Sequence, residues 1–254
     1  MKDLALGAGK IIKDKFHAVK KWHAKADLGD IVTEVDIASE KYVIDRIREQ
    51  YPDDRILSEE SGVIGEGSKG RLWIIDPLDG TRNYMTGIPF FCVSIVVTAD
   101  GKPEMGVIYD PIHDEMYFAS RGGGAYLNDE PIHVSTQESL RDSLVSVSWV
   151  RRKVDREVFV DYIEQISRDT SYFRRLGSAA LVLTYIAAGR LHAYMQGGLN
   201  PWDVAAGVLI VEEAGGVVTD FQGEPIDLRN PDIEILTSNP VLHKLLLDNV
   251  ISKR

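Results

Sequence analysis

The sequence lacks three features that would each point to a particular class of protein. Its single cysteine, Cys92, lies in the apolar run FFCVSIVV, so we expect a core residue, no internal disulfide and a reducing compartment. Lysine and arginine number 29 against 39 aspartates and glutamates, and this net charge of -10 argues against a nucleic-acid-binding surface. The opening MKDLALGAGKIIKDKF lacks the apolar core of a signal peptide or membrane span. We therefore expect a cytoplasmic protein without nucleic-acid or membrane partners.

Histidine is also sparse, and it follows no catalytic pattern. The six histidines show neither triad nor metal-ligand spacing, and we expect surface or packing roles for His17, His23, His113, His133, His192 and His243. The sequence contains no repeat, low-complexity segment or long linker. Residues 1–254 are therefore expected to form a single domain with two halves, roughly 1–140 and 141–254.

The apolar periodicity changes along the chain and predicts a mixed α/β fold. Residues 4–21 and 35–51 have helical spacing. Residues 71–133 contain short β-rich runs separated by turn signals, which predict a largely antiparallel meander. After about residue 142, strands and helices alternate, including a polar helix near 156–168 and a last helix from Pro240. This alternation predicts an α/β half that contains βαβ-like units.

The stretch LWIIDPLDGTRNY, residues 72–84, ends an apolar strand on two carboxylates. Pro77 biases Asp76 towards extended geometry, and Asp79 with Gly80 forms a turn, so both carboxylates can face one pocket. One interpretation is a simple turn. The other is a site for a hard cation such as Mg²⁺, with a phosphate against the backbone N–H groups of Gly80 and Thr81.

Three further segments contain carboxylates, and each also has an ordinary structural explanation. The run LSEESG, residues 57–62, is explained by a solvated acidic face. Asp203 lies in the first turn of a helix within NPWDVAAGVLIVEEAGG, where capping explains a carboxylate. In DIVTEVD, residues 30–36, Thr33 and Asp36 have the spacing of a capping box.

Taken together, these segments resemble the inositol monophosphatase family of magnesium-dependent, lithium-sensitive phosphatases. WIIDPLDGTRNY and WDVAAGVLIVEEAGG resemble the two family signatures, and DIVTEVD, LSEES and RRLGSAA accompany them in the expected order. The resemblance implies a layered α-β-α-β-α sugar-phosphatase sandwich, an antiparallel meander half followed by an alternating α/β half. It also implies an active site between the halves, a homodimer and inhibition by lithium.

The resemblance implies two to three Mg²⁺ ions in each active site. Glu59, Asp76 and the backbone carbonyl of Leu78 would bind the first ion. Asp76, Asp79 and Asp203 would bind the second, and Glu59 would contact a third mostly through water. A divalent cation lowers the pKa of water enough to supply hydroxide near neutral pH.

The resemblance also assigns catalytic and substrate-binding residues. Thr81 and Asp36 would orient and help deprotonate the attacking water, with Glu59 as a third catalytic residue. Lys25 matches a loop near the third metal ion. The implied contacts to a small phosphorylated substrate are Asp79, Gly80, Thr81, Gly177, Ser178, Ala179, Gln196 and Asp203.

The identity of the substrate stays open at the level of sequence. Gln196 stands where inositol-specific members have a glutamate, and an amide both donates and accepts hydrogen bonds, so specificity is expected to relax. Inositol monophosphate and related small sugar phosphates are the first substrates that we expect. Fructose-1,6-bisphosphate and the 2'-phosphate of NADP are alternatives, and the extra segments expected for adenosine bisphosphate are not evident. A different class of function is a regulatory protein that contacts the transcription machinery and retains the phosphatase scaffold.

Overall fold

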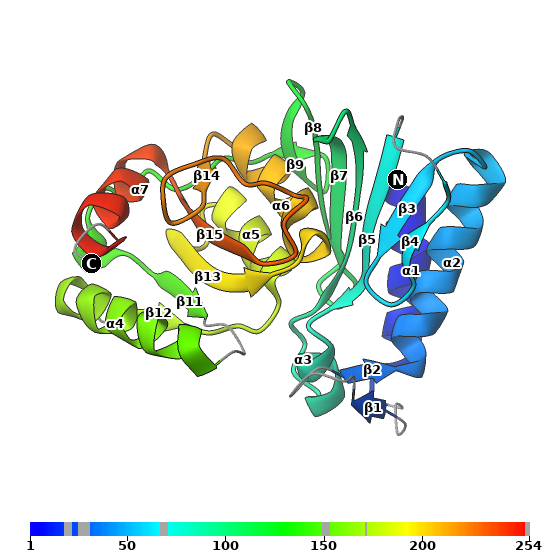
Figure 1. Cartoon of the computed structure of the whole chain (residues 1–254), viewed down its shortest axis with the longest axis horizontal. Coiled ribbons are helices and arrows are strands. Elements are labelled where there is room, and N and C mark those ends of the chain that lie inside the picture. Colours follow the sequence, from blue (N-terminus) through cyan, green and yellow to red (C-terminus); the bar gives the residue numbers. More distant parts are fainter. Residues whose placement is uncertain (18–21, 25–30, 67–70, 149–152, 171, 252–254) are drawn as a thin grey trace.

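The computed structural model describes residues 1–17, 22–24, 31–66, 71–148, 153–170 and 172–251, and these form five layers (Figure 1). Helices α1 (Lys2–Lys15) and α2 (Glu34–Gln50) cover the outer face of a large sheet. Helices α5 (Ala179–Ala187) and α6 (Pro201–Glu213) fill the space between this sheet and a smaller one. Helices α4 (Lys153–Asp169) and α7 (Pro240–Leu246) lie on the far side of the small sheet. The predicted α-β-α-β-α layering is therefore confirmed.

The large sheet contains the predicted meander, extended by two strands that the sequence analysis did not identify. Its order is β10-β9-β8-β7-β6-β5-β3-β4, and every pair is antiparallel except β3 with β5. The meander pairs successive strands because short turns connect them. The strands are β3 (Arg55–Ser58), β4 (Gly62–Ile64), β5 (Arg71–Asp79), β6 (Cys92–Ala99), β7 (Lys102–Asp110), β8 (Glu115–Ser120), β9 (Gly124–Leu127) and β10 (Glu130–Pro131).

The small sheet has the order β12-β11-β13-β15-β14 and contains the predicted βαβ connections. β11 is parallel to β12 and β13, with α4 and α5 as the connecting helices, whereas β15 is antiparallel to both of its neighbours. The strands are β11 (Val145–Ser148), β12 (Phe173–Arg174), β13 (Ala193–Leu199), β14 (Val217–Thr219) and β15 (Ile233–Ser238). A separate pair, β1 (Trp22–Ala24) and β2 (Ile31–Thr33), lies beside α3 (Thr81–Thr86).

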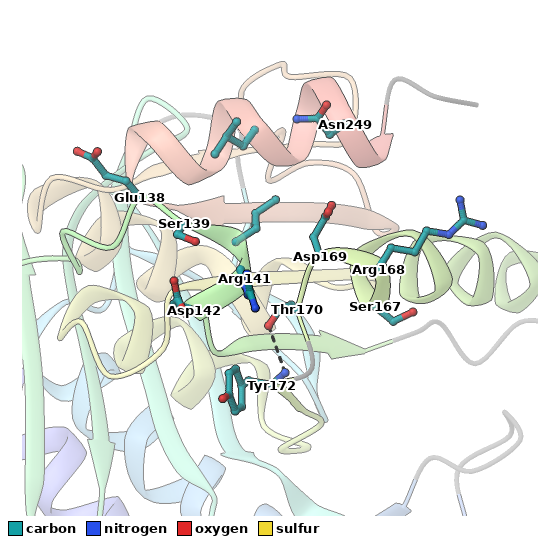
Figure 2. Close-up of a pocket in the computed structure, with 12 residues that line it drawn as sticks. Glu138, Ser139, Arg141, Asp142, Ser167, Arg168, Asp169, Thr170, Tyr172 and Asn249 are labelled. Atoms are coloured by element: carbon teal, nitrogen blue, oxygen red, sulfur yellow. Dashed lines mark hydrogen bonds between the residues drawn. The ribbon is translucent and has the colours of Figure 1, made fainter.

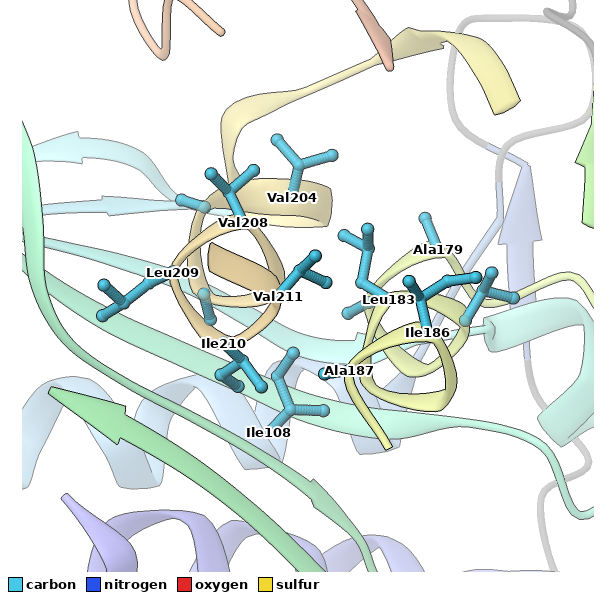
Figure 3. Close-up of a cluster of buried hydrophobic side chains, with 14 of the residues drawn as sticks. Ile108, Ala179, Leu183, Ile186, Ala187, Val204, Val208, Leu209, Ile210 and Val211 are labelled. Atoms are coloured by element: carbon cyan, nitrogen blue, oxygen red, sulfur yellow. The ribbon is translucent and has the colours of Figure 1, made fainter. Parts of the chain in front are cut away.

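The largest apolar cluster is centred on α5 and α6, which are apolar on nearly every side because sheets cover both of their faces. Figure 3 shows Leu183 of α5 and Val211 of α6 pointing toward one another, with Ile108 of β7 below them. Cys92 is buried in this cluster, as predicted. The central helices are therefore fixed between the sheets, and their first turns are held at defined positions.

The first helix is shorter than predicted. Helical spacing suggested residues 4–21, but α1 ends at Lys15, and the next two residues leave the helical conformation. Phe16 has φ -59° and ψ 131°, outside the helical region, and its half-buried ring packs with its centroid 4.9 Å from that of Phe91. Residues 18–21 and Lys25, the residue assigned to a loop near a third metal ion, lie outside the described residues. Among the helices described, none is long and apolar enough to cross a membrane.

Candidate active site

A β-bulge in β5 brings the two aspartates of the DPLD segment to the same side. Asp76 pairs with Ser94 and Asp79 pairs with Cys92, so three steps along β5 oppose two steps along β6. In a regular strand, residues three apart face opposite sides, and the extra residue of the bulge corrects this difference. Pro77 lies within the bulge, a position where a strand tolerates proline.

Glu59 joins these carboxylates because β3 and β5 are parallel. Ser58, the last residue of β3, pairs with Ile75, and the N–H of Glu59 donates to the Ile75 carbonyl at 3.2 Å. The residues that follow this pair, Glu59 and Asp76, are therefore both acids and lie at the same edge of the sheet. Glu59 interacts directly with Asp76, since both its charge and a hydrogen bond between the two side chains raise the pKa of Asp76.

The fourth carboxylate comes from the second half of the chain. Asp203 lies in the first turn of α6, where its Oδ2 accepts the backbone N–H of Asn200 at 2.6 Å. One carboxylate oxygen from each of Asp76, Asp79 and Asp203 lies within 4.8 Å of the others. Asp203 therefore both caps α6 and belongs to the acidic cluster. The site thus joins the large sheet to α6.

Without a cation, burial of these carboxylates and their mutual repulsion destabilise the folded state. Asp76 is 1% exposed, and burial followed by the charges of Glu59, Asp79 and Asp203 raises its pKa well above the ordinary value. Burial also raises the pKa of Asp79, although hydrogen bonds from Ser178 and Ala180 oppose this shift. The donor set consists of oxygen atoms alone, which suits a hard cation such as Mg²⁺.

Thr81 and Asp36 form a hydrogen-bonded pair beside the cluster. Thr81 Oγ1 lies 3.1 Å from Asp36 Oδ1 and 3.0 Å from the Leu78 carbonyl oxygen, so its single proton has two acceptors. Asp36 is also the predicted capping-box residue, because its Oδ2 accepts the Thr33 backbone N–H at 2.9 Å. Burial is the main cause that raises the pKa of Asp36 to about 6.

The turn after Asp79 requires glycine. Gly80 has φ 93°, and a Cβ there would lie 3.0 Å from the Phe90 carbonyl oxygen. α3 begins directly after it, and the first helical hydrogen bond runs from the Tyr84 N–H to the Gly80 carbonyl. The N–H groups of Thr81 and the two residues after it therefore precede the helical ladder.

The loop that contains the expected substrate contacts Gly177, Ser178 and Ala179 bonds directly to the acidic site. Ser178 Oγ donates to Asp79 Oδ2 at 2.6 Å, and the Ala180 N–H donates to the same oxygen at 2.7 Å. Gly177, with φ 87°, lies against Asn83 of α3. Ala179 is the first residue of α5. The bonds between Asp79 and this loop could not be predicted from local patterns, because the partners are separated by 99 and 101 residues in the chain.

Two residues near the site were missed by the sequence analysis. The Tyr194 hydroxyl donates to Gln196 Oε1 at 2.6 Å, and its pKa is raised by burial first and then by Asp79 and Asp203. The buried Glu40 accepts hydrogen bonds from the backbone N–H groups of residues 60 and 61, directly after Glu59. An alternating strand pattern could have suggested that Tyr194 and Gln196 share a face.

A separate pocket of about 1020 Å³ lies in the α4 and α7 layer (Figure 2). Its charged residues are of both signs, and none of the acids of the candidate site lines it. This mixture offers no clear preference for an anionic substrate. The charged lining residues are Glu138, Arg141, Asp142, Arg168 and Asp169.

Comparison with known proteins identifies the family. The model of the inositol monophosphatase family matches residues 1–253. The Nus factor SuhB of Haemophilus influenzae is 43% identical over 221 residues, which cover 86% of this chain and 82% of that protein. The extragenic suppressor protein suhB of Bartonella henselae superimposes with a TM-score of 0.92 at 35% identity, covering 98% of this chain and 96% of that one. The Thermotoga maritima IMPase gives 0.88 at 34% identity, covering 99% and 94%.

The chain therefore belongs to the inositol monophosphatase family, as its motifs indicated. Mixed α/β architecture, two main sheets and an acidic cluster between the large sheet and α6 are properties of this chain itself.

Proposed function

We propose that the protein is a Mg²⁺-dependent phosphomonoesterase that hydrolyses inositol monophosphate or related small sugar phosphates. The observation that carries this proposal is the cluster of the buried Asp76 and Asp79 with the half-buried Asp203, each of which places one oxygen within 4.8 Å of the others. Glu59 adds a fourth carboxylate. Carboxylates held this close repel one another, and a divalent cation is the simplest partner that relieves the repulsion.

Two to three Mg²⁺ ions fit the number of available ligands. Glu59, Asp76 and the Leu78 carbonyl would hold one ion, and Asp76, Asp79 and Asp203 would hold another. A third would interact with Glu59, mostly through water. When bound, Mg²⁺ lowers the pKa of a water molecule and neutralises charge on the phosphate oxygens.

Thr81 and Asp36 would position the attacking water. At neutral pH most Asp36 carboxyl groups are ionised, because the pKa is about 6, and Oδ1 can accept the Thr81 proton at 3.1 Å. Thr81 Oγ1 then offers a lone pair to a water proton and aims the water oxygen at phosphorus. The new phosphorus–oxygen bond would form as the ester bond breaks, while one water proton passes through Thr81 to Asp36. The leaving alkoxide would take a proton from a second water molecule, giving inorganic phosphate and the free alcohol.

The substrate side of the site supports a small polar alcohol. The Gln196 Oε1 is engaged by Tyr194, so the amide NH₂ group is the part of this side chain left to donate. We propose that this donor relaxes specificity relative to a glutamate, which keeps fructose-1,6-bisphosphate and NADP as alternative substrates. The homodimer, the cytoplasmic location, lithium inhibition and the single two-half domain likewise remain predictions.

A phosphatase panel tests this function. Phosphate release is measured with Mg²⁺ for inositol monophosphate, fructose-1,6-bisphosphate, NADP and 3'-phosphoadenosine 5'-phosphate. Wild-type protein should hydrolyse at least one of them, and Asp79→Asn should be inactive. The proposal is contradicted if the wild-type protein releases phosphate from none of these esters, or if wild type and Asp79→Asn release it equally.

The relatives named Nus factor SuhB favour a second candidate, a regulatory protein that contacts the transcription machinery. A chromosomal Asp79→Asn substitution separates the two functions in the source organism. Growth like that of the wild type, in a strain where deletion of the gene causes a defect, would favour the regulatory function. A defect equal to deletion, with normal protein levels, would favour the enzyme.

A further inference from the structure

Asp79 is held by the first turn of a helix in the opposite half of the chain. Its Oδ2 accepts the Ser178 hydroxyl at 2.6 Å and the Ala180 N–H at 2.7 Å, and Cys92 Sγ lies 3.9 Å away. Asp79 is 8% exposed, so water competes little for these bonds. A backbone hydrogen bond from Ala179 also lowers the pKa of Asp79, so the first turn of α5 holds this carboxylate at several points.

The Ser178 hydroxyl is fully used within the protein. It has one proton, which Asp79 accepts, and its oxygen accepts the Leu181 N–H at 3.3 Å as the N-cap of α5. Ser178 is 2% exposed. This hydroxyl is therefore poorly placed to donate to a substrate, the role that the resemblance suggested for it.

The same loop is attached to α3 at a further point. Asn83 Nδ2 donates to the Leu176 carbonyl at 2.7 Å and to the Phe90 carbonyl at 2.8 Å. Gly177 passes so close to Asn83 that a Cβ would lie 3.0 Å from Nδ2. Residues 176–180, the α5 entry loop, are thus bonded to residues 79 and 83, on either side of the turn at Gly80.

We propose that the α5 entry loop is a clamp for the cation site, and that Ser178 is a positioning residue for Asp79 rather than a substrate contact. The clamp fixes the carboxylate rotamer so that Asp79 keeps one oxygen within 4.8 Å of Asp76 and Asp203. The inference rests on the proposed function in one respect, namely that the cation is Mg²⁺. Groups that orient a metal ligand through a hydrogen bond commonly change metal affinity when they are removed.

Isothermal titration of the whole protein with Mg²⁺, without substrate, tests the clamp. Ser178→Ala removes the donor and should raise the Mg²⁺ Kd about tenfold, whereas Ser178→Thr keeps a hydroxyl and should stay within about twofold of wild type. Thr184→Val is the matched control, because it removes another buried hydroxyl of α5 which, within the described part of the chain, bonds to the Leu181 carbonyl of its own helix. The Mg²⁺ Kd of Thr184→Val should equal that of the wild type. Circular dichroism establishes that each variant is folded.

A second variant and a kinetic measurement distinguish the remaining outcomes. Asn83→Ala, which cuts the bond to the Leu176 carbonyl and leaves Ser178 intact, should also weaken Mg²⁺ binding and keeps the test valid if Ser178→Ala does not fold. Unchanged Mg²⁺ affinity in the folded variants overturns the clamp, as does a rise in substrate KM at saturating Mg²⁺ without a change in Mg²⁺ Kd. A wild-type protein that binds no Mg²⁺ overturns the proposed function itself.

Discussion

At the scale of single residues, several side chains of the site have both a structural and a chemical role. Asp36 caps α2 and accepts from Thr81, and Asp203 caps α6 and joins the acidic cluster. A cap needs only an acceptor oxygen, whereas a cation site also needs negative charge. Substitutions that keep the oxygen and remove the charge can therefore separate the two roles.

Asp203→Asn tests whether capping of α6 and cation binding by this residue can be separated. Asparagine is a good capping residue, so circular dichroism should change little, and the metal-free protein should melt no lower than wild type because one repelling charge is removed. Loss of the charge should reduce kcat/KM by at least about a hundredfold, the upper end of the effect of groups that only orient metal ligands. Phosphate release at several Mg²⁺ concentrations is the measurement. Near-native activity would show that Asp203 does not bind the cation.

Gln196→Glu tests the origin of specificity. A carboxylate keeps the hydrogen bond from Tyr194 and adds a charged acceptor for a hydroxyl, which should favour inositol monophosphate over fructose-1,6-bisphosphate by about 1–2 kcal/mol. The measurement is the ratio of kcat/KM for the two esters at saturating Mg²⁺. Tyr194→Phe is the companion variant, because it frees Oε1 without adding charge. A ratio that is identical in wild type and Gln196→Glu means that this side chain faces away from the substrate.

At the scale of elements, local chemistry explains which parts of the fold could be predicted. Turn residues and alternating apolar residues identified β5 to β9, and the capping patterns identified the starts of α2 and α6. The short strands β3 and β4 were missed, since four residues such as RILS have too few repeats to define a period. The bonds between the α5 entry loop and Asp79 depend on packing of the two halves, which local sequence does not encode.

The junction of β5 and α3 gives a prediction about backbone shape. Gly80→Ala should destabilise the protein by about 1–2 kcal/mol because φ is 93°. Contact with the Phe90 carbonyl should also shift the turn, and kcat/KM should fall by up to about a hundredfold. Gly101→Ala is the control, since its φ is 78° but a Cβ there meets nothing within 4 Å. Urea denaturation and phosphatase assays measure both effects, and equal activity of the two variants would contradict the prediction.

The contact between α7 and β14 gives a pH dependence of stability. His243 of α7 is 5% exposed, its Nε2 lies 3.0 Å from Thr219 Oγ1, and burial lowers its pKa. The folded state therefore binds this proton less readily than the unfolded chain. The stability contribution is complete above the unfolded pKa of about 6.5 and is lost as the pH falls through the folded pKa.

His243→Gln should reduce the loss of stability between pH 7.5 and pH 5.5. Urea denaturation at both pH values supplies the measurement, and the difference between proteins removes the contribution of other titrating groups. His133→Gln is the matched control, because His133 is exposed. If His243→Gln retains the full pH dependence, protonation of His243 does not destabilise the fold.

At the scale of the whole molecule, the acidic cluster lies at the junction of the large sheet and α6. Asp76 and Asp79 belong to the large sheet and Asp203 to α6, so charge repulsion between them acts across the junction. The chain already carries a net charge of -10, which adds to repulsion in the compact state. A divalent cation at this junction should therefore stabilise the entire fold and not only one loop.

Removal of Mg²⁺ should lower the melting temperature, because a ligand that binds only the folded state stabilises it in proportion to the logarithm of its concentration. At a hundred times the Kd, one site contributes about 2.7 kcal/mol, which corresponds to about 5–10 °C for a chain of this size. Thermal unfolding is compared in Mg²⁺ and in EDTA, with sodium chloride added to equalise ionic strength. Asp79→Asn should lose most of the shift, whereas Thr184→Val should keep it. A melting temperature independent of Mg²⁺ would mean that the carboxylates are tolerated without a cation, through the protonation that their raised pKa values permit.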